Sequence, residues 1–210
     1  MYKAFFKRVL DLIIGIIAFP FFCLAFIIFG PIIKLTDRGP IFYNAQRIGK
    51  NGKLFKMYKF RSMYVNSPDI RNADGSTFNG KNDARVTRIG KIMRETSIDE
   101  IPQVLNIING SMSLIGPRPD PPDDMLIYTE EEKKKLTVRP GLTGYNQAYY
   151  RNSIEQKVKF ANDVFYAQNI SFSLDMKILF RTVIMVISHK DVYTSIPTLE
   201  DNNTEKQKNV

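Results

Sequence analysis

The chain has 210 residues, with 30 Lys and Arg against 21 Asp and Glu, so its formal net charge is +9. A positive excess of this size favours an anionic partner such as a membrane surface, a phosphorylated substrate or nucleic acid. A single cysteine, Cys23, excludes an internal disulfide framework, and a single histidine, His189, excludes a metal site built from several histidines.

The first predicted element is an apolar segment of 22 uncharged residues, 12–33. Its length exceeds the roughly 18 residues that indicate a membrane helix, and the cleavage site of a secretory signal is not evident. Pro20 lies near its middle and has no N–H to donate, so a helix would break or kink there. Two alternatives remain open: a kinked helix that spans the bilayer, and a re-entrant helix that returns to the side it entered.

Charges on both sides of the apolar segment are compatible with the re-entrant form. Lys3, Lys7 and Arg8 precede the segment, and the stretch 34–61 after it carries eight Lys and Arg residues. The positive-inside rule then places both ends in the cytoplasm. Each arm of about 11 residues would measure about 17 Å, which is about half of the ~30 Å hydrocarbon core.

The remainder of the chain is predicted to form helices and one β-hairpin. The predicted elements are a hairpin over 41–63 with its turn at Asn51-Gly52, a polar loop over 66–84, and helices over 86–95, 97–109, 153–168 and 173–188. Residues 129–136 carry acids and lysines three and four positions apart, which is typical of a solvated helix face. The tail from Ser195 onward is polar and is predicted to be disordered.

Two adjacent acids, Asp99 and Glu100, open the predicted helix 97–109. One interpretation is structural. Ser97 and Glu100 match the S-x-x-E capping box, in which both side chains satisfy free N–H groups, and the acids complement the helix dipole. The other interpretation is catalytic, because a helix N-terminus attracts anions and several motifs supply cations that can bind phosphate. Those cations are Lys59, Arg61, Arg94, Arg118 and Arg139.

Carboxylates among cations, without a histidine, point to phosphate chemistry. An acid in such a site can hold Mg²⁺, which prefers carboxylate and phosphate oxygens. Alternatively, the acid can attack phosphorus directly and form an acyl phosphate. These residue types alone do not separate the two roles for Asp99 and Glu100.

The order and spacing of several motifs resemble the bacterial sugar transferases, also called monotopic phosphoglycosyl transferases, over residues 1 to about 192. The matching positions are Lys7, Arg8, Asp11, Pro20, Gln46, Arg47, Gly49, the stretches "KFRSM", "SIDEIPQ", "GSMSLIGPRP" and "VRPGLTG", and then Asp163, Tyr166, Asn169, Ser171 and Asp175. The chain departs from the family pattern at Phe19, where Ser often precedes the bend proline, and at Tyr150, where Gly is common. The identity of the sugar is therefore not carried over.

The resemblance implies transfer of a phosphosugar from a UDP-sugar to a polyprenol phosphate such as undecaprenyl phosphate, which releases UMP and initiates glycan assembly. By this resemblance Asp99 is the nucleophile of a covalent aspartyl-phosphosugar intermediate, Mg²⁺ binds beside Asp99, and Glu100 supports the metal or the nucleophile. The implied substrate-binding residues are Lys59, Arg61, Arg94, Arg118, Arg139, Gln147 and Arg151.

The implied fold class is α+β. A re-entrant membrane helix broken at Pro20 (residues 1–35) precedes a small, mostly helical cytoplasmic domain with a β-hairpin (36–194) and the polar tail (195–210). The protein is then expected on the cytoplasmic face of the bacterial inner membrane, with both termini cytoplasmic, the lipid bilayer as a partner, and no nucleic acid. The alternative is a non-enzymatic, membrane-anchored protein that binds nucleic acid or acidic lipid through the basic stretch 47–61.

Overall fold

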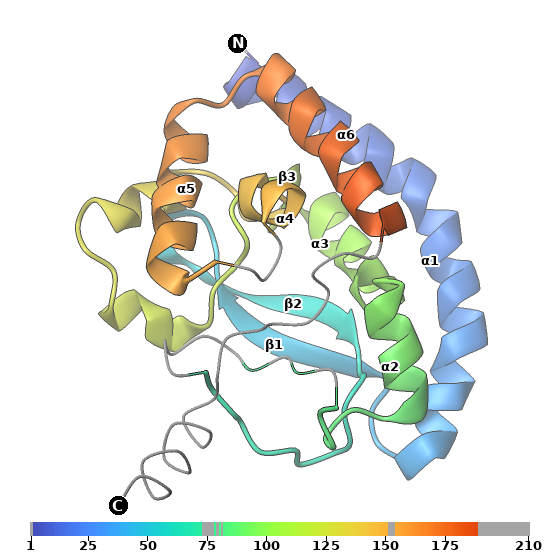
Figure 1. Ribbon diagram of the computed structural model, residues 1–210. Helices are drawn as coiled ribbons and strands as arrows, with labels where there is room; N and C mark the ends of the chain where they lie inside the picture. Colours follow the sequence, from blue (N-terminus) through green and yellow to red (C-terminus); the bar gives the residue numbers. More distant parts are fainter. Residues whose placement is uncertain (1, 73–77, 79, 81, 151–153, 189–210) are drawn as a thin grey trace, which may run out of the picture.

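The computed structural model describes residues 2–72, 78, 80, 82–150 and 154–188, so Arg151 and the tail 195–210 lie outside the described residues (Figure 1). The elements in chain order are η1 (Tyr2–Phe6), α1 (Lys7–Asp37), β1 (Phe42–Ile48), η2 (Lys50–Gly52), β2 (Leu54–Phe60), α2 (Arg88–Glu95), η3 (Ile98–Gln103), α3 (Val104–Asn109), β3 (Ser113–Ile115), η4 (Pro122–Leu126), η5 (Glu132–Thr137), β4 (Gly141–Thr143), α4 (Tyr145–Tyr149), α5 (Gln156–Gln168) and α6 (Phe172–Ser188). A long apolar N-terminal helix and a mostly helical domain with two small sheets agree with the expected mixed class.

Helix α1 runs without interruption for 31 residues and contains both Pro20 and Pro31. The break expected at Pro20 is therefore not seen in this structure. A proline removes one backbone hydrogen bond, but the ladder of hydrogen bonds can continue on either side of it, so the helix can bend instead of ending. Figure 1 shows α1 following a curved path along one side of the domain.

The two faces of α1 meet different surroundings. The buried positions of the helix are Asp11, Gly15, Phe22, Ala25, Gly30 and Ile33. Elsewhere on the helix, large apolar side chains are exposed, among them Ile16, Ile27 and Leu35. Among the described residues α1 is the one helix long and apolar enough to cross a membrane. One side of α1 thus packs on the domain, and its exposed apolar surface suggests association with a membrane.

The predicted hairpin is confirmed, with β1 and β2 antiparallel from the pair Phe42↔Phe60 to the pair Ile48↔Leu54. Five residues connect the strands, where the sequence predicted a two-residue turn. Asn51 and Gly52 both have positive φ, as predicted for a tight turn, but the backbone N–H of Gly49 donates to the carbonyl of Lys53 and closes a wider loop.

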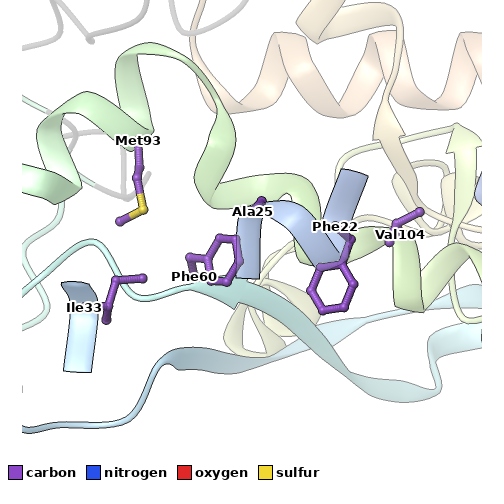
Figure 2. Close-up of a cluster of buried hydrophobic side chains, with 6 residues drawn as sticks. All are labelled: Phe22, Ala25, Ile33, Phe60, Met93 and Val104. Carbon is purple, nitrogen blue, oxygen red and sulfur yellow. The ribbon is translucent and has the colours of Figure 1, made fainter. Parts of the chain in front are cut away.

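A shared hydrophobic core holds α1 against the domain (Figure 2). Its buried members are Phe22, Ala25 and Ile33 of α1, Phe60 of β2, Met93 of α2 and Val104 of α3. The rings of Phe22 and Phe60 stack with their centroids 6.5 Å apart. Because neighbouring side chains alternate across a strand, Phe60 in the core directs Lys59 to the other face of β2.

A second, parallel sheet positions the loop that follows β3. Strand β3 pairs with β4 through Ser113↔Gly141 and Ile115↔Thr143. The two backbones approach so closely that a Cβ on Gly141 would lie 2.1 Å from the backbone nitrogen of Gly116. Glycine is therefore required at this contact, and it holds the start of the loop that carries Arg118.

The remaining predicted helices are borne out with one difference. Helices α2, α5 and α6 lie within or close to the predicted segments 86–95, 153–168 and 173–188. The single helix predicted over 97–109 is instead a 3₁₀ segment, η3, followed by α3. Pro102 lies inside η3 and has no N–H for the α-helical hydrogen-bond pattern, which accounts for the tighter first segment.

Candidate active site

Asp99 and Glu100 lie in the first turn of η3, but the predicted capping box is wrong. Ser97 adopts a left-handed conformation with φ of 58°, and its side chain makes no capping hydrogen bond. Its carbonyl instead accepts the backbone N–H of Glu100 at 3.1 Å. The side chain of Glu100 pairs with cations from other elements instead.

Lys59 of β2 bridges the two acids. Its ammonium nitrogen lies 2.9 Å from Oδ2 of Asp99 and 3.2 Å from Oε1 of Glu100. Asp99 is 2% exposed, so this ion pair is largely shielded from solvent. Strand β2 thus places one positive charge between two carboxylates that are adjacent in sequence.

Arg118 brings a second cation to the same acid pair. It lies in the loop after β3, and its Nη2 donates to Oε1 of Glu100 at 3.0 Å. Half of the Arg118 side chain is exposed, whereas about a fifth of Glu100 is. A ligand that arrives from solvent can therefore reach Arg118 directly, beside the buried Asp99.

The surroundings shift the pKa values of the two acids in opposite directions. Burial raises the pKa of Asp99. The neighbouring negative charge of Glu100 raises that pKa further, and the positive charge of Lys59 opposes both effects. Burial also acts to raise the pKa of Glu100, but Arg118 and Lys59 outweigh it and lower that pKa to about 2. Glu100 is thus charged at neutral pH and already held by two cations, while Asp99 is the more basic of the two carboxylates.

Arg94 is the third predicted cation that belongs to this region. It lies on α2, and its Nε donates to the hydroxyl of Ser62 at 2.9 Å. Its charge lowers the pKa of Asp99, although less than that of Lys59 does. Helix α2 begins at the Thr87 cap, whose hydroxyl accepts the N–H of Gly90 at 2.9 Å.

The contacts of the other predicted binding residues lie elsewhere. Arg61 donates to both carboxylate oxygens of Asp37 at 2.5 Å and to the carbonyl of Pro40, so it holds the end of α1. Arg139 donates to the carbonyl of Gly110 at 2.9 Å, at the C-terminal end of α3. A cation at a helix C-terminus is a stabilising feature, and this end of α3 is opposite the end that follows Asp99.

Gln147 differs from these arginines because its amide is unsatisfied. Within the described part of the chain, both the side-chain nitrogen and oxygen of Gln147 are buried without a hydrogen-bond partner. Leaving a buried polar group unpaired costs about 1–3 kcal/mol. Such an amide favours binding of a water or a ligand, and the substrate-binding role of Gln147 stays a prediction.

A buried ion cluster around Lys135 was not predicted from the sequence. Lys135 falls in the segment 129–136 expected to be a solvated face, yet it is 3% exposed and pairs with Asp120 and Asp163. Its neighbours Lys133 and Lys134 do form the expected surface pairs with acids three residues before them. No local pattern distinguishes Lys135 from these two lysines, because its carboxylate partners lie 15 and 28 residues away.

The donor set of the acid pair fits Mg²⁺. Among the described residues no group of three His, Cys, Asp or Glu comes together, so the chain does not offer a cage of its own for a metal. Mg²⁺ usually binds through one or two carboxylates, with water and substrate phosphates as the other ligands. Asp99 and Glu100 supply two carboxylates, and in this structure the ammonium of Lys59 lies between them.

Comparison with known proteins identifies the family of this chain. The family model "Bacterial sugar transferase" matches residues 2–189. An uncharacterized sugar transferase of Bacillus subtilis, EpsL, is 40% identical over 183 residues, which cover 86% of this chain and 87% of the relative. An undecaprenyl-phosphate galactose phosphotransferase of Salmonella typhimurium is 35% identical over 206 residues, or 90% of this chain.

The relatives differ in length. The chain spans 42% of the Salmonella relative, and also 42% of an uncharacterized sugar transferase of Haemophilus influenzae that is 38% identical over 204 residues. It spans most of the Bacillus relative. Since the family model covers nearly the whole sequence, this chain belongs to the bacterial sugar transferase family.

Proposed function

We propose that this protein transfers a sugar phosphate from a UDP-sugar to undecaprenyl phosphate and so initiates the assembly of a bacterial glycan. The observation that carries the proposal is the acid pair Asp99 and Glu100, held between Lys59 and Arg118. The similarity to the undecaprenyl-phosphate galactose phosphotransferase of Salmonella supports the acceptor and the reaction class.

The reaction proceeds in two displacements at one phosphorus. The carboxylate of Asp99 attacks the β-phosphorus of the donor, the bond from that phosphorus to the bridging oxygen breaks, and UMP leaves with the bonding electron pair. A phosphate oxygen of undecaprenyl phosphate then attacks the aspartyl phosphosugar. The acyl phosphate bond breaks, Asp99 returns to its carboxylate form, and the polyprenol-diphosphate sugar is released.

The surrounding charges suit this chemistry. An anionic carboxylate must approach an anionic diphosphate, and fixed cations lower that repulsion. Arg118 is open to solvent and can contact the donor phosphates, while Lys59 faces the acids. Mg²⁺, when held by Asp99 and Glu100, would neutralise charge on the diphosphate. The greater basicity of Asp99 makes it the better nucleophile of the pair.

We expect the purified protein in detergent to release UMP from at least one UDP-sugar when Mg²⁺ and undecaprenyl phosphate are present. A panel of UDP-hexoses and UDP-N-acetylhexosamines, assayed for UMP, tests this directly. Omitting undecaprenyl phosphate is the control, because it allows at most one UMP per protein molecule. If no donor in the panel supports acceptor-dependent release, the proposed function is wrong.

We place the protein on the cytoplasmic face of the inner membrane, with both ends of α1 on the same side. Both ends contact one domain, through Lys7 to Asp175 of α6 at one end and Asp37 to Arg61 after β2 at the other. A straight helix of 31 residues measures about 46 Å, and a span perpendicular to the ~30 Å core would separate its ends across the bilayer. In a bilayer, Pro20 is the position at which α1 would bend to return.

Cysteine labelling tests this topology. In a Cys23→Ala background, Phe6→Cys and Leu35→Cys put thiols at opposite ends of α1, where the native side chains are 49% and 81% exposed. We expect a membrane-impermeant maleimide to label neither in spheroplasts and both in inverted vesicles. Glu130→Cys, on the exposed surface of the domain, is the cytoplasmic reference. Labelling of either end in spheroplasts would contradict the same-side arrangement.

A further inference from the structure

The loop that carries Arg118 is restrained where it begins. Four prolines flank the arginine in the stretch "GPRPDPP", residues 116–122, and limit the conformations of the loop. The N–H of Gly116 donates to the carbonyl of Thr143 at 2.9 Å, and the N–H of Gly141 donates to the carbonyl of Pro117 at 2.8 Å. The β3–β4 sheet therefore fixes the chain immediately before Arg118.

Asp120 fixes the same loop two residues after Arg118. Its Oδ2 accepts the ammonium of Lys135 at 2.5 Å and the hydroxyl of Tyr128 at 2.5 Å. Its backbone carbonyl accepts the N–H of Ile48, the last residue of β1, at 2.9 Å. Arg118 is thus held in a short span between two attachments.

Lys135, which binds Asp120, is itself held in place by further contacts. Its ammonium lies over the ring of Phe160 at 4.6 Å and contacts a second carboxylate, Oδ2 of Asp163, at 2.6 Å. Asp163 also accepts from the side chain of Asn146 at 2.8 Å. Burial acts to lower the pKa of Lys135, but Asp163 and Asp120 outweigh it and raise that pKa, so the ammonium keeps its charge.

A buried ion cluster of this kind is weak evidence for stability, because desolvation offsets much of the attraction. Its geometry, however, restricts the positions of the groups it joins. Lys135 joins the Arg118 loop, through Asp120, to α5, through Asp163. The Arg118 side chain then meets Glu100 with its Nη2 3.0 Å from Oε1.

We propose that the Asp120–Lys135 ion pair is a positioning device for donor binding: it holds the loop so that the Arg118 guanidinium lies beside the acid pair and meets the donor phosphates. The inference rests on the proposed function, in which Arg118 contacts the donor. Asp120 and Lys135 are positioning residues, because they act through Arg118 and touch no reacting atom.

The chain offers a matched pair of substitutions that tests the proposal. Asp120→Asn and Asp163→Asn each remove one of two carboxylates from the same buried ammonium, and each keeps the size and an acceptor oxygen. Only Asp120 lies in the Arg118 loop. We expect Asp120→Asn to raise KM for the UDP-sugar between about 10- and 100-fold, since misplacement by about 1 Å can cost ~10²-fold. We expect Asp163→Asn to change KM by less than about twofold. Its loss of thermal stability should be comparable to that of Asp120→Asn.

A double-mutant cycle with Arg118→Ala separates positioning from general loosening. If Asp120 acts through Arg118, the rise in KM caused by Asp120→Asn should vanish in the Arg118→Ala background, whereas Asp163→Asn should have the same small effect in both backgrounds. Tyr128→Phe removes one hydrogen bond from Asp120 and serves if Asp120→Asn does not fold. It should raise KM in the same direction but less.

The two proposals fail in different ways. If the wild-type protein releases no UMP, the proposed function is wrong. If the wild type is active and Arg118→Ala raises KM, but Asp120→Asn matches Asp163→Asn or adds fully to Arg118→Ala, then positioning by Asp120 is wrong while the proposed function stands.

Discussion

Replacing Asp99 with asparagine should lower sugar-phosphate transfer by about 10⁴-fold or more, the scale on which loss of a covalent nucleophile lowers kcat in other enzymes. Asparagine matches aspartate in size, so it fits a site in which Asp99 is 2% exposed. Its neutral amide is too weak a nucleophile to displace UMP from phosphorus. The measurement is UMP release from the best UDP-sugar, with undecaprenyl phosphate present.

The same substitution should eliminate the covalent intermediate. Wild-type protein quenched after incubation with donor alone should gain the mass of one phosphosugar, located on the peptide that contains Asp99. Glu100→Gln is the matched control, because it neutralises the adjacent acid and leaves Asp99 in place. That variant should turn over slowly and still carry the adduct on Asp99. An adduct located on Glu100, or one that persists in Asp99→Asn, would reassign the nucleophile.

Replacing Asp175 with alanine should lower the free energy of unfolding by about 3 kcal/mol, the scale for breaking a buried ion pair. Asp175 lies on α6 with 0% exposure, and its carboxylate accepts from Lys7 at 2.6 Å, Tyr2 at 2.6 Å and Tyr166 at 2.7 Å. These donors come from η1, α1 and α5, so one carboxylate joins the start of the chain to two later helices. Alanine would remove this acceptor from three polar groups, of which the Tyr166 hydroxyl would keep the carbonyl of Ile115 at 3.1 Å.

Thermal unfolding in detergent measures this effect. For a chain of this size, a loss of about 3 kcal/mol corresponds to a fall of roughly 6–12 °C in Tm. Asp69→Ala is the matched control, since Asp69 pairs with Arg71 at the surface and 64% of its side chain is exposed. Such exposed pairs contribute about 0–1 kcal/mol. Equal shifts in the two variants would show that the Asp175 cluster does not hold α1 to the domain.

The attachment of α1 bears on how the candidate active site would meet the proposed lipid acceptor. Arg8 of α1 donates to the carbonyls of Ile107 and Ile108 at 2.6 and 2.9 Å, at the end of α3. Asp11 accepts the hydroxyl of Ser113 and the N–H of Leu114 in β3. The apolar helix is therefore packed directly on the elements that follow Asp99 and precede Arg118. A bilayer that receives α1 would hold the acid pair at a defined position relative to its surface.

Much of this arrangement was predictable from local patterns. The apolar run, the Asn-Gly turn between alternating strands and the apolar faces of α2, α5 and α6 depend on residues close together in sequence. Asp99, Glu100, Lys59 and Arg118 were predicted as one site because acids and cations of this kind suit phosphate chemistry, and the structure brings them together. The resemblance of the motifs to one family was confirmed by the match over residues 2–189.

Other features depended on contacts that no local pattern contains. The S-x-x-E pattern at Ser97 predicted a cap, but Pro102 and the distant cations Lys59 and Arg118 favoured a different conformation and a different partner for Glu100. In the sequence Lys135 resembles its solvated neighbours, but in the structure it is buried and pairs with Asp120 and Asp163.

The sequence by itself determined the kinds of element, through periodicity and turn residues, and it indicated the family through the resemblance of its motifs. It also predicted the chemical character of the candidate site. Only the tertiary structure decided which charges are buried and which pairs they form. Arg61 holds the end of α1, Arg139 holds the end of α3, and Arg118 meets Glu100. Three arginines that look alike in sequence differ because the desolvation and the partners of a charge are set by residues that are distant along the chain.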